Sequence, residues 1–349
     1  MQRARVQLKS GTGIASAYAA AIAEAARFVG ATAPNPPVGC AILDADGEIL
    51  TVAAHHRAGA PHAEALALLQ CEAAGSLSRA ATAVITLEPC NHVGRTRPCT
   101  DALLASPIRD VWIGAGDPNP RVTGGGAARL CEAGLAVQVA PPDSPEGRDC
   151  LALIAPFTSF IRGLRPWITV KQALDAEGSM IPPAGARTFT APLSLHLAHR
   201  LRRATDAIIT GMGTVLADAP HFTVRHVADH ADRRRIIAVL DRTGALPAAW
   251  RQEAQARGFR VATAPDLGGL MQLLLDEGVL WAMVEGGPRL LDILARASLW
   301  DDWLTIRHRP EGEDLVGIRA RTAITPLRLV EGMPAAMTVE REAVCSPAS

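Results

Sequence analysis

The sequence alternates short β-branched segments with helix-like segments along most of its length, and this alternation restricts the fold more than any other feature. In the first part of the chain, strands are predicted at residues 38–43, 48–55, 82–87, 110–113 and 135–139, and helices at residues 16–28 and 62–74. Asp46-Gly47, between the first two strands, is typical of a tight hairpin turn. Strands and helices that alternate in this way build a sheet covered by helices, so the fold class is α/β.

A segment rich in turn residues separates this series from a second one. Residues 140–147 are Ala-Pro-Pro-Asp-Ser-Pro-Glu-Gly, which is typical of a linker. Beyond it, strands are predicted at residues 167–172, 207–210, 236–240 and 281–284, and helices at residues 193–203 and 267–277. We therefore expect two α/β domains, residues 1–147 and 148–349.

Composition excludes several classes of protein. Hydrophobic residues make up 48% of the chain, which excludes a disordered protein. Lys plus Arg and Asp plus Glu each number 35, so the chain has no overall positive charge to attract nucleic acid or anionic lipid. No apolar run approaches the roughly 18 residues of a membrane span. We expect a cytoplasmic protein in which the seven cysteines are thiols or metal ligands rather than disulfides.

The most specific local pattern is His62-Ala63-Glu64, followed by Pro89-Cys90 and then by Cys99. One imidazole and two thiolates supply three ligands for zinc and leave a fourth tetrahedral position for water, as in catalytic zinc sites. Zinc lowers the pKa of such a water to about 7. Glu64 lies on the same helical turn as His62, so it can transfer a proton from that water to a departing amine without binding the metal.

A His-x-Glu pattern combined with Pro-Cys is the signature of zinc-dependent nucleobase deaminases, in which the two cysteines are usually two residues apart. Here eight residues, 91–98, lie between them, so the ligand loop is enlarged. Taken alone, each residue also fits a purely structural role, with His62 at the end of a helix and the two cysteines in a hydrophobic core. The full combination favours the metal site.

Four motifs give this half of the chain a family resemblance. They are residues 88–99, residues 34–39, residues 55–64, and Asp117-Pro118-Asn119-Pro120 with Gly124 and Gly126. Together they closely resemble the bifunctional pyrimidine deaminase/reductase of riboflavin biosynthesis. The resemblance implies a cytidine-deaminase-like three-layer domain that deaminates 2,5-diamino-6-ribosylamino-4(3H)-pyrimidinone 5′-phosphate. It also implies that substrate is bound by Asn35, His55, Arg95 and the neighbouring loop residue His92.

The second half has weak motifs when it is considered by itself. Gly211-Met212-Gly213-Thr214 and Glu285-Gly286-Gly287 each follow a predicted strand, where glycines make simple turns or let amides approach a phosphate. These segments, with 171–173 and 222–225, resemble the reductase domain of the same family. That resemblance implies a dihydrofolate-reductase-like α/β domain that uses NADPH to reduce the ribosyl group to ribityl. It assigns NADPH contacts to Ala173, Thr214 and Asp218, and contacts with the ribosyl phosphate to Arg202, the Phe222 backbone, Arg225 and Glu285.

This half departs from the family pattern at several positions. Asp175 replaces a serine, Ala219 replaces an aspartate, and the usual Ser and Trp are missing near residues 185–190. Three alternatives therefore stay open: a deaminase with a degenerate reductase domain, a tRNA or DNA base deaminase, and a scaffold with structural zinc. The neutral charge argues against the second. We expect small-molecule partners, no nucleic acid and no membrane, and the sequence leaves a homo-oligomer open.

Overall fold

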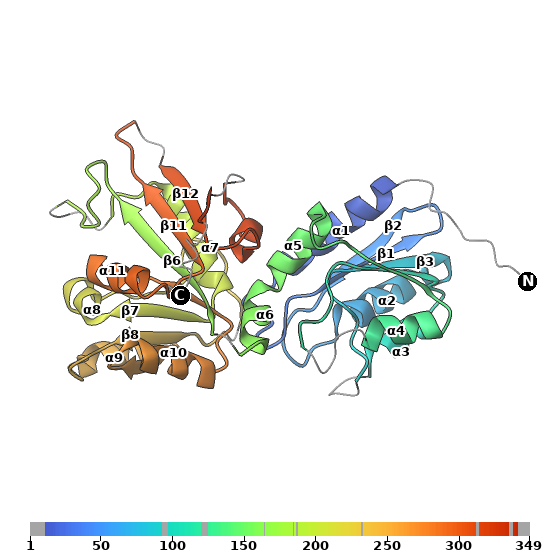
Figure 1. Ribbon diagram of the computed structural model, residues 1–349, viewed down its shortest axis with the longest axis horizontal. Helices are drawn as coiled ribbons and strands as arrows, with labels where there is room; N and C mark the ends of the chain where they lie inside the picture. The colour runs from blue at the N-terminus through green and yellow to red at the C-terminus, as the bar shows by residue number, and fades with distance from the viewer. Residues whose placement is uncertain are drawn as a thin grey trace, which may run out of the picture. The chain divides into compact units, whose positions relative to one another are not determined.

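The computed structural model describes residues 11–92, 97–119, 125–163, 165–183, 185, 188–231, 233–311, 314–334 and 338–340. Contacts within the chain divide it into two compact units, Met1–Arg162 and Gly163–Ser349. Each unit contains a sheet with helices packed on it, as predicted (Figure 1). Within the described residues, none of the helices combines the length and the apolar character needed to cross a bilayer.

A five-stranded sheet in the order β2-β1-β3-β4-β5 forms the middle of the first unit. Its strands are β1 (Gly39–Asp44), β2 (Ile49–Ala54), β3 (Ala80–Ile85), β4 (Asp110–Ile113) and β5 (Ala136–Val139). β1 is antiparallel to β2 and β3, whereas β3, β4 and β5 are parallel. The predicted hairpin is confirmed, and Gly47 adopts the positive φ that its turn requires.

Helices cover both faces of this sheet, so the unit has three layers (Figure 1). They are α1 (Gly11–Ala26), α2 (Ala63–Ala73), α3 (Cys99–Leu104), α4 (Gly125–Glu132), α5 (Pro145–Leu153) and α6 (Ala155–Ile161), with a 3-10 turn, η1, at Leu77–Arg79. α1 and α5 pack together on one face, and α2 and α3 pack together on the other. A Cβ atom on Gly39 of β1 would lie 2.0 Å from the Ala21 carbonyl oxygen, so the close packing of α1 requires glycine there.

α5 and α6 follow the predicted linker but belong to the first unit. The Ser144 hydroxyl caps α5 by accepting a hydrogen bond from the Gly147 amide at 3.0 Å. α5 then packs against α1 and buries Cys150 and Leu153. The contacts therefore place the division after Arg162, whereas the sequence led us to expect it after residue 147.

The second unit is built on an eight-stranded sheet in the order β13-β12-β11-β6-β10-β7-β8-β9. Its strands are β6 (Trp167–Leu174), β7 (Ala207–Gly211), β8 (Ile236–Leu240), β9 (Arg260–Ala264), β10 (Trp281–Val284), β11 (Asp302–Arg307), β12 (Leu315–Ala320) and β13 (Thr338–Val339). Neighbouring strands from β11 to β9 in that order are parallel, and β12 turns back antiparallel to β11. The central parallel strands are buried, as is usual when helices cover both faces.

In the described part of this unit, five α-helices and one short 3-10 turn accompany the sheet. They are α7 (Pro192–Ala204), α8 (Met212–Asp218), α9 (Ala248–Ala256), α10 (Leu267–Asp276), α11 (Pro288–Arg296) and the 3-10 turn η2 (Pro326–Leu329). The main core gathers aliphatic side chains of β6, β7, β8 and β10 with those of α10 and α11. The turns after β7 and β10, where the predicted glycine motifs lie, meet at one edge of the sheet, because parallel strands end on the same side.

A buried carboxyl group lies inside this sheet. Asp302 Oδ2 accepts hydrogen bonds from Trp167 Nε1 at 2.6 Å and from the Thr169 hydroxyl at 3.4 Å. The Thr169 hydroxyl in turn accepts one from Trp281 Nε1 at 2.8 Å. Burial raises the pKa of Asp302 from its ordinary value near 3.8 to about 7, although its hydrogen bonds oppose the shift. The neutral form of this carboxyl group is therefore favoured by folding.

We predict that Asp302→Asn removes part of the pH dependence of stability. The stability that neutral Asp302 provides is complete below the unfolded pKa and is lost as the pH rises from about 4 to about 7. Asparagine has no such titration, so above pH 7 the variant should be more stable than wild type by on the order of 1–4 kcal/mol. Urea unfolding at several pH values, followed by tryptophan fluorescence, measures this difference, because five of the six tryptophans lie in this unit. Asp276→Asn, at an exposed position on α10, is the matched control, and equal pH slopes in the two variants would contradict the prediction.

Candidate active site

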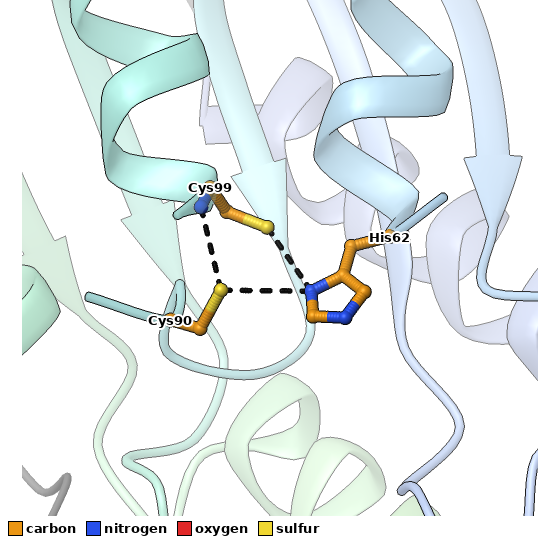
Figure 2. A group of neighbouring side chains, drawn as sticks. All are labelled: His62, Cys90 and Cys99. Atoms are coloured by element: carbon orange, nitrogen blue, oxygen red, sulfur yellow. Dashed lines mark hydrogen bonds between the residues drawn. The ribbon is translucent and has the colours of Figure 1, made fainter. Parts of the chain in front are cut away.

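The three predicted zinc ligands come from separate segments and meet at one point (Figure 2). His62 immediately precedes α2, Cys90 lies in the loop after β3, and Cys99 is the first residue of α3. His62 Nδ1 lies 3.2 Å from Cys99 Sγ and 3.6 Å from Cys90 Sγ. All three ligand atoms lie within 4.8 Å of one another. The structure therefore brings together residues that are 37 positions apart in the sequence.

These separations fit a zinc ion. Usual zinc–sulfur and zinc–nitrogen bond lengths in a tetrahedron place a nitrogen and a sulfur ligand about 3.6 Å apart. The two distances from His62 Nδ1, 3.2 and 3.6 Å, are close to that value. Among the described residues, the metal-binding group contains these three donors and no fourth, so the set is that of a catalytic site with an open corner.

The charge of the cysteines also suits a cation. The Cys99 amide donates a hydrogen bond to Cys90 Sγ at 3.3 Å. Hydrogen bonds from Cys99 and His62 lower the pKa of Cys90 to about 4, so this sulfur is a thiolate at neutral pH. Cys99 shares its thiol proton with Cys90 Sγ in a hydrogen bond, and this bond raises the pKa of Cys99. Thiolate is the form of cysteine that binds metals, and a divalent cation can take the place of the shared proton.

Glu64 lies in the first turn of α2 and is 3% exposed. It lines a cavity of about 500 Å³ together with His62 and Cys90. The cavity is also lined by Pro34, Asn35, Pro36, Val38, His55, Ala58, Gly59, Ala60, Leu87, Glu88, His92, Asp117, Asn119 and Phe157. Burial raises the pKa of Glu64, which brings proton exchange by this carboxyl group closer to neutral pH.

Asn35 and His55 form one side of this cavity and are hydrogen-bonded to each other. His55 Nδ1 lies 3.1 Å from the Pro61 carbonyl oxygen, which can only accept, so Nδ1 carries the ring proton. Burial lowers the pKa of His55, so the ring is neutral and its Nε2 accepts from Asn35 Nδ2 at 3.2 Å. This pairing fixes the amide of Asn35 with Oδ1 as its remaining acceptor.

In the second unit, a buried ion pair joins Arg202 of α7 to Glu285, which follows β10. Arg202 Nη2 donates to Glu285 Oε2 at 2.7 Å, and Nε donates to Oε1. Lys171 Nζ of β6 lies 3.9 Å from the same carboxylate. Burial alone would raise the pKa of Glu285, but the charges of Arg202 and Lys171 lower it to about 2. The carboxylate is therefore ionised at all physiological pH values.

A loop after α8 approaches this ion pair. Arg202 Nη1 donates to the Thr223 carbonyl oxygen at 3.1 Å. Arg225 Nη1 donates to the Thr223 hydroxyl at 3.3 Å, and the rest of the Arg225 side chain is exposed. Phe222 has a φ of 56° and buries its ring in the core, 6.5 Å from the ring of Trp250. The four residues assigned to the ribosyl phosphate thus belong to one continuous cluster, formed by Arg202, Phe222, Arg225 and Glu285.

The three residues assigned to NADPH lie on the neighbouring elements. The Thr214 hydroxyl, in the first turn of α8, accepts a hydrogen bond from the Gly287 amide at 3.0 Å. This bond joins the two glycine-containing turns that follow β7 and β10. Ala173 pairs with Ile306 near the end of β6, and Asp218 is exposed at the end of α8.

Two family models match this chain. Residues 14–115 match the cytidine and deoxycytidylate deaminase zinc-binding region, and residues 166–308 match the RibD C-terminal domain. The riboflavin biosynthesis protein RibD of Aquifex aeolicus is 34% identical over 80% of this chain and 83% of its own length. The chain belongs to the RibD family. The RibD protein of Corynebacterium ammoniagenes, 38% identical over 80% of this chain and 81% of its own length, agrees with this assignment.

Solved structures of RibD proteins share the fold across both units. A RibD structure from Acinetobacter baumannii has a TM-score of 0.72 and 28% identity, covering 85% of this chain and 86% of its own. A diaminohydroxyphosphoribosylaminopyrimidine deaminase/5-amino-6-(5-phosphoribosylamino)uracil reductase from Thermotoga maritima has a TM-score of 0.75 and 27% identity, covering 87% of this chain and 89% of its own. The predicted order of a deaminase-like domain and a reductase domain is confirmed, and this RibD-family chain is an enzyme with a zinc-binding deaminase unit.

Some site residues were predicted and others were missed. Arg95, expected to bind substrate, lies outside the described residues. Phe157 of α6 lines the cavity, but a single aromatic residue in an apolar segment gave no signal of this role. Glu88 was seen only as part of a motif. Its Oε1 accepts hydrogen bonds from the Gly126 and Ala127 amides, both at 3.1 Å, and so fixes the start of α4 beside the loop that carries Cys90.

Arg129 of α4 ties together the residues that follow the two zinc-binding cysteines. Its Nη1 donates to Asn91 Oδ1 at 2.8 Å and to the Thr100 hydroxyl at 3.1 Å, and its Nη2 donates to Asp101 Oδ1 at 2.5 Å. The Thr100 hydroxyl also donates to Asn91 Oδ1 at 3.1 Å. Since Asn91 and Thr100 are the direct neighbours of Cys90 and Cys99, this cluster holds the two sulfurs at a fixed separation.

We predict that Arg129→Met accelerates zinc loss. The substitution keeps an unbranched side chain of similar length but removes all three hydrogen bonds, so zinc affinity should fall about 10–100-fold, as for other partners of metal ligands. Zinc release to a chromogenic chelator measures this effect. Arg148→Met, on α5 of the same unit, is the matched control, and equal release rates from Arg129→Met and Arg148→Met would contradict the prediction.

Proposed function

We propose that the first unit deaminates 2,5-diamino-6-ribosylamino-4(3H)-pyrimidinone 5′-phosphate and that the second unit reduces the product, 5-amino-6-(5-phosphoribosylamino)uracil, with NADPH. The Thermotoga maritima protein is named for these two activities. The observation that carries the proposal is the meeting of three zinc ligands at one point, with two of them, His62 and Cys90, lining a cavity of about 500 Å³ together with buried Glu64. That volume lies in the range of pockets that enclose small molecules.

In deamination, water replaces the ring amino group and ammonia leaves. His62, Cys90 and Cys99 would hold zinc, which when bound would supply Lewis acidity and lower the pKa of water to near neutral. Glu64 takes up the proton that water loses and delivers it to the departing amino group. The raised pKa of Glu64 suits both proton uptake from water and proton delivery to the amino group. A carboxyl group whose pKa is closer to neutral accepts a proton and gives it up again at a small cost in free energy.

Asn35 and His55 bind and orient the pyrimidine in this proposal. Asn35 Oδ1 is left to accept a hydrogen bond, because its Nδ2 donates to His55. A diaminopyrimidine offers amino donors that match this acceptor. His92 lines the same cavity, and Arg95 is assigned to the phosphate group by resemblance to the family.

In the second unit, bound NADPH would supply the hydride that, together with a proton from water, converts the ribosyl group to ribityl and leaves NADP⁺. Ala173, Thr214 and Asp218 hold this cofactor in our proposal. Arg202 and Arg225 bind the ribosyl phosphate, and Glu285 fixes the guanidinium of Arg202 by its two parallel hydrogen bonds. The Phe222 ring is held in the core. In our proposal, its backbone therefore borders the position of the ribosyl phosphate.

The partners of this enzyme are small molecules in our proposal. The described residues hold no helix that could span a membrane, and the zero net charge offers no overall attraction for nucleic acid. A cytoplasmic location is proposed because the zinc site depends on two thiolates, which that compartment keeps reduced.

A coupled assay tests both activities on one preparation. With the diaminopyrimidine substrate, we expect ammonia release followed by stoichiometric oxidation of NADPH. Ammonia release without NADPH oxidation would refute the proposed reductase activity if NADPH also stays unoxidised when deaminated substrate is added directly. The protein would then be a deaminase with a degenerate second unit.

Glu64→Gln tests the role of the carboxyl group. The amide cannot transfer a proton, so deamination should fall about 10²–10⁴-fold, while zinc content stays equal to wild type. Ammonia release and metal analysis measure the two quantities. NADPH oxidation with deaminated substrate serves as the internal control, since the second unit is unaltered. Deamination at the wild-type rate would remove Glu64 from this mechanism.

A further inference from the structure

His199 of α7 lies between the two arginines of the reductase cluster and is 3% exposed. Its Nδ1 lies 2.9 Å from the backbone nitrogen of Arg225, and its Nε2 lies 3.5 Å from Arg202 Nη1. The ring of His226 packs edge-on against it with a centroid separation of 4.6 Å. None of the family motifs described above includes His199.

The contacts define the state of the His199 ring. A backbone amide can only donate, so Nδ1 accepts from Arg225 and the proton of the neutral ring lies on Nε2. Burial and the neighbouring charge of Arg202 lower the pKa of His199 to about 3. The ring is therefore a neutral, permanent acceptor for one backbone amide.

That amide belongs to a loop with two attachments to α7. Arg202 holds the loop by the Thr223 carbonyl oxygen, and His199 holds it by the Arg225 amide. The exposed Arg225 side chain extends from this second attachment. Without it, the backbone of Arg225 would gain freedom that phosphate binding must remove, and this ordering weakens binding.

We propose that His199 is a positioning residue of the reductase: it fixes the backbone at Arg225 and so holds the Arg225 side chain where it recognises the substrate phosphate beside Arg202. This inference rests on the proposed function, because that function supplies the phosphate-bearing substrate. His199 has no contact with the reacting atoms in this role. Its contribution is to substrate recognition and not to hydride transfer.

The test compares NADPH-dependent reduction of 5-amino-6-(5-phosphoribosylamino)uracil with reduction of the same compound without its phosphate. The measured quantity is the ratio of the two kcat/KM values. This ratio does not depend on the fraction of folded enzyme, because misfolding lowers both values equally. His199→Leu removes the acceptor at similar volume and should lower the ratio about tenfold, the usual effect of one lost hydrogen bond of this kind, through KM for the phosphorylated substrate.

Two further variants make the test specific. His199→Asn places Oδ1 where Nδ1 was, since both atoms are bonded to Cγ, and should restore most of the ratio. His196→Leu alters the same helix one turn earlier, where His196 Nδ1 donates to the Pro192 carbonyl oxygen, and should leave the ratio unchanged. Deamination by all three variants should equal that of wild type.

An unchanged ratio in His199→Leu, or an equal loss for both substrates, would overturn the role of His199 while the proposed function stands. No rescue by His199→Asn would also overturn it. Failure of wild type to oxidise NADPH with either substrate would overturn the reductase activity itself, and with it this inference.

Discussion

The first unit depends on bringing three donor atoms from distant segments within the bonding radius of one ion. The start of α2 supplies the imidazole, the loop after β3 supplies one sulfur, and the start of α3 supplies the other. α2 and α3 pack against each other, and His62, immediately before α2, faces Cys99, the first residue of α3. The Cys99 amide at the start of α3 also donates a hydrogen bond that stabilises the Cys90 thiolate. The same helix end therefore supplies one zinc ligand, Cys99, and favours the ionised form of the other sulfur ligand, Cys90.

The second unit depends on a different interaction, a buried pair of opposite charges. Removing Arg202 and Glu285 from water costs free energy that the attraction between them does not reliably recover. Their two parallel hydrogen bonds, with Lys171 near the same carboxylate, leave a net positive group at the edge of the sheet. Such a group suits the phosphate binding that we propose for this edge.

The sequence predicted both sheets and the zinc ligands because these features have local patterns. Alternation marked most strands, Asp46-Gly47 marked the hairpin, and the spacing of His62, Glu64 and the two cysteines marked the metal site. β9, β11, β12 and β13 were not predicted: β9 and β11 are short apolar runs bounded by charged residues, Gly317 and Arg319 interrupt β12, and β13 has only two residues. The predicted first helix covered residues 16–28, whereas α1 begins at Gly11, because glycines at residues 11 and 13 have low helix propensity and gave no helical signal.

Residues that act through tertiary hydrogen bonds had no pattern to reveal them. Arg129 and His199 look like an ordinary helical arginine and histidine in the sequence, and only the packed structure shows their partners. One departure from the family pattern has a local explanation. Asp175 Oδ1 accepts hydrogen bonds from the Glu177 and Ser179 amides, so the carboxylate stabilises the turn after β6.

The helices α5 and α6 affect how the two halves of the gene can be separated. α5 packs on α1, and α6 contributes Phe157 to the wall of the deaminase cavity. A fragment that stopped at the proline-rich segment would expose the α1 surface and open that wall to solvent. A deaminase fragment that continued to Arg162 would keep α5 and α6 with the unit on which they pack.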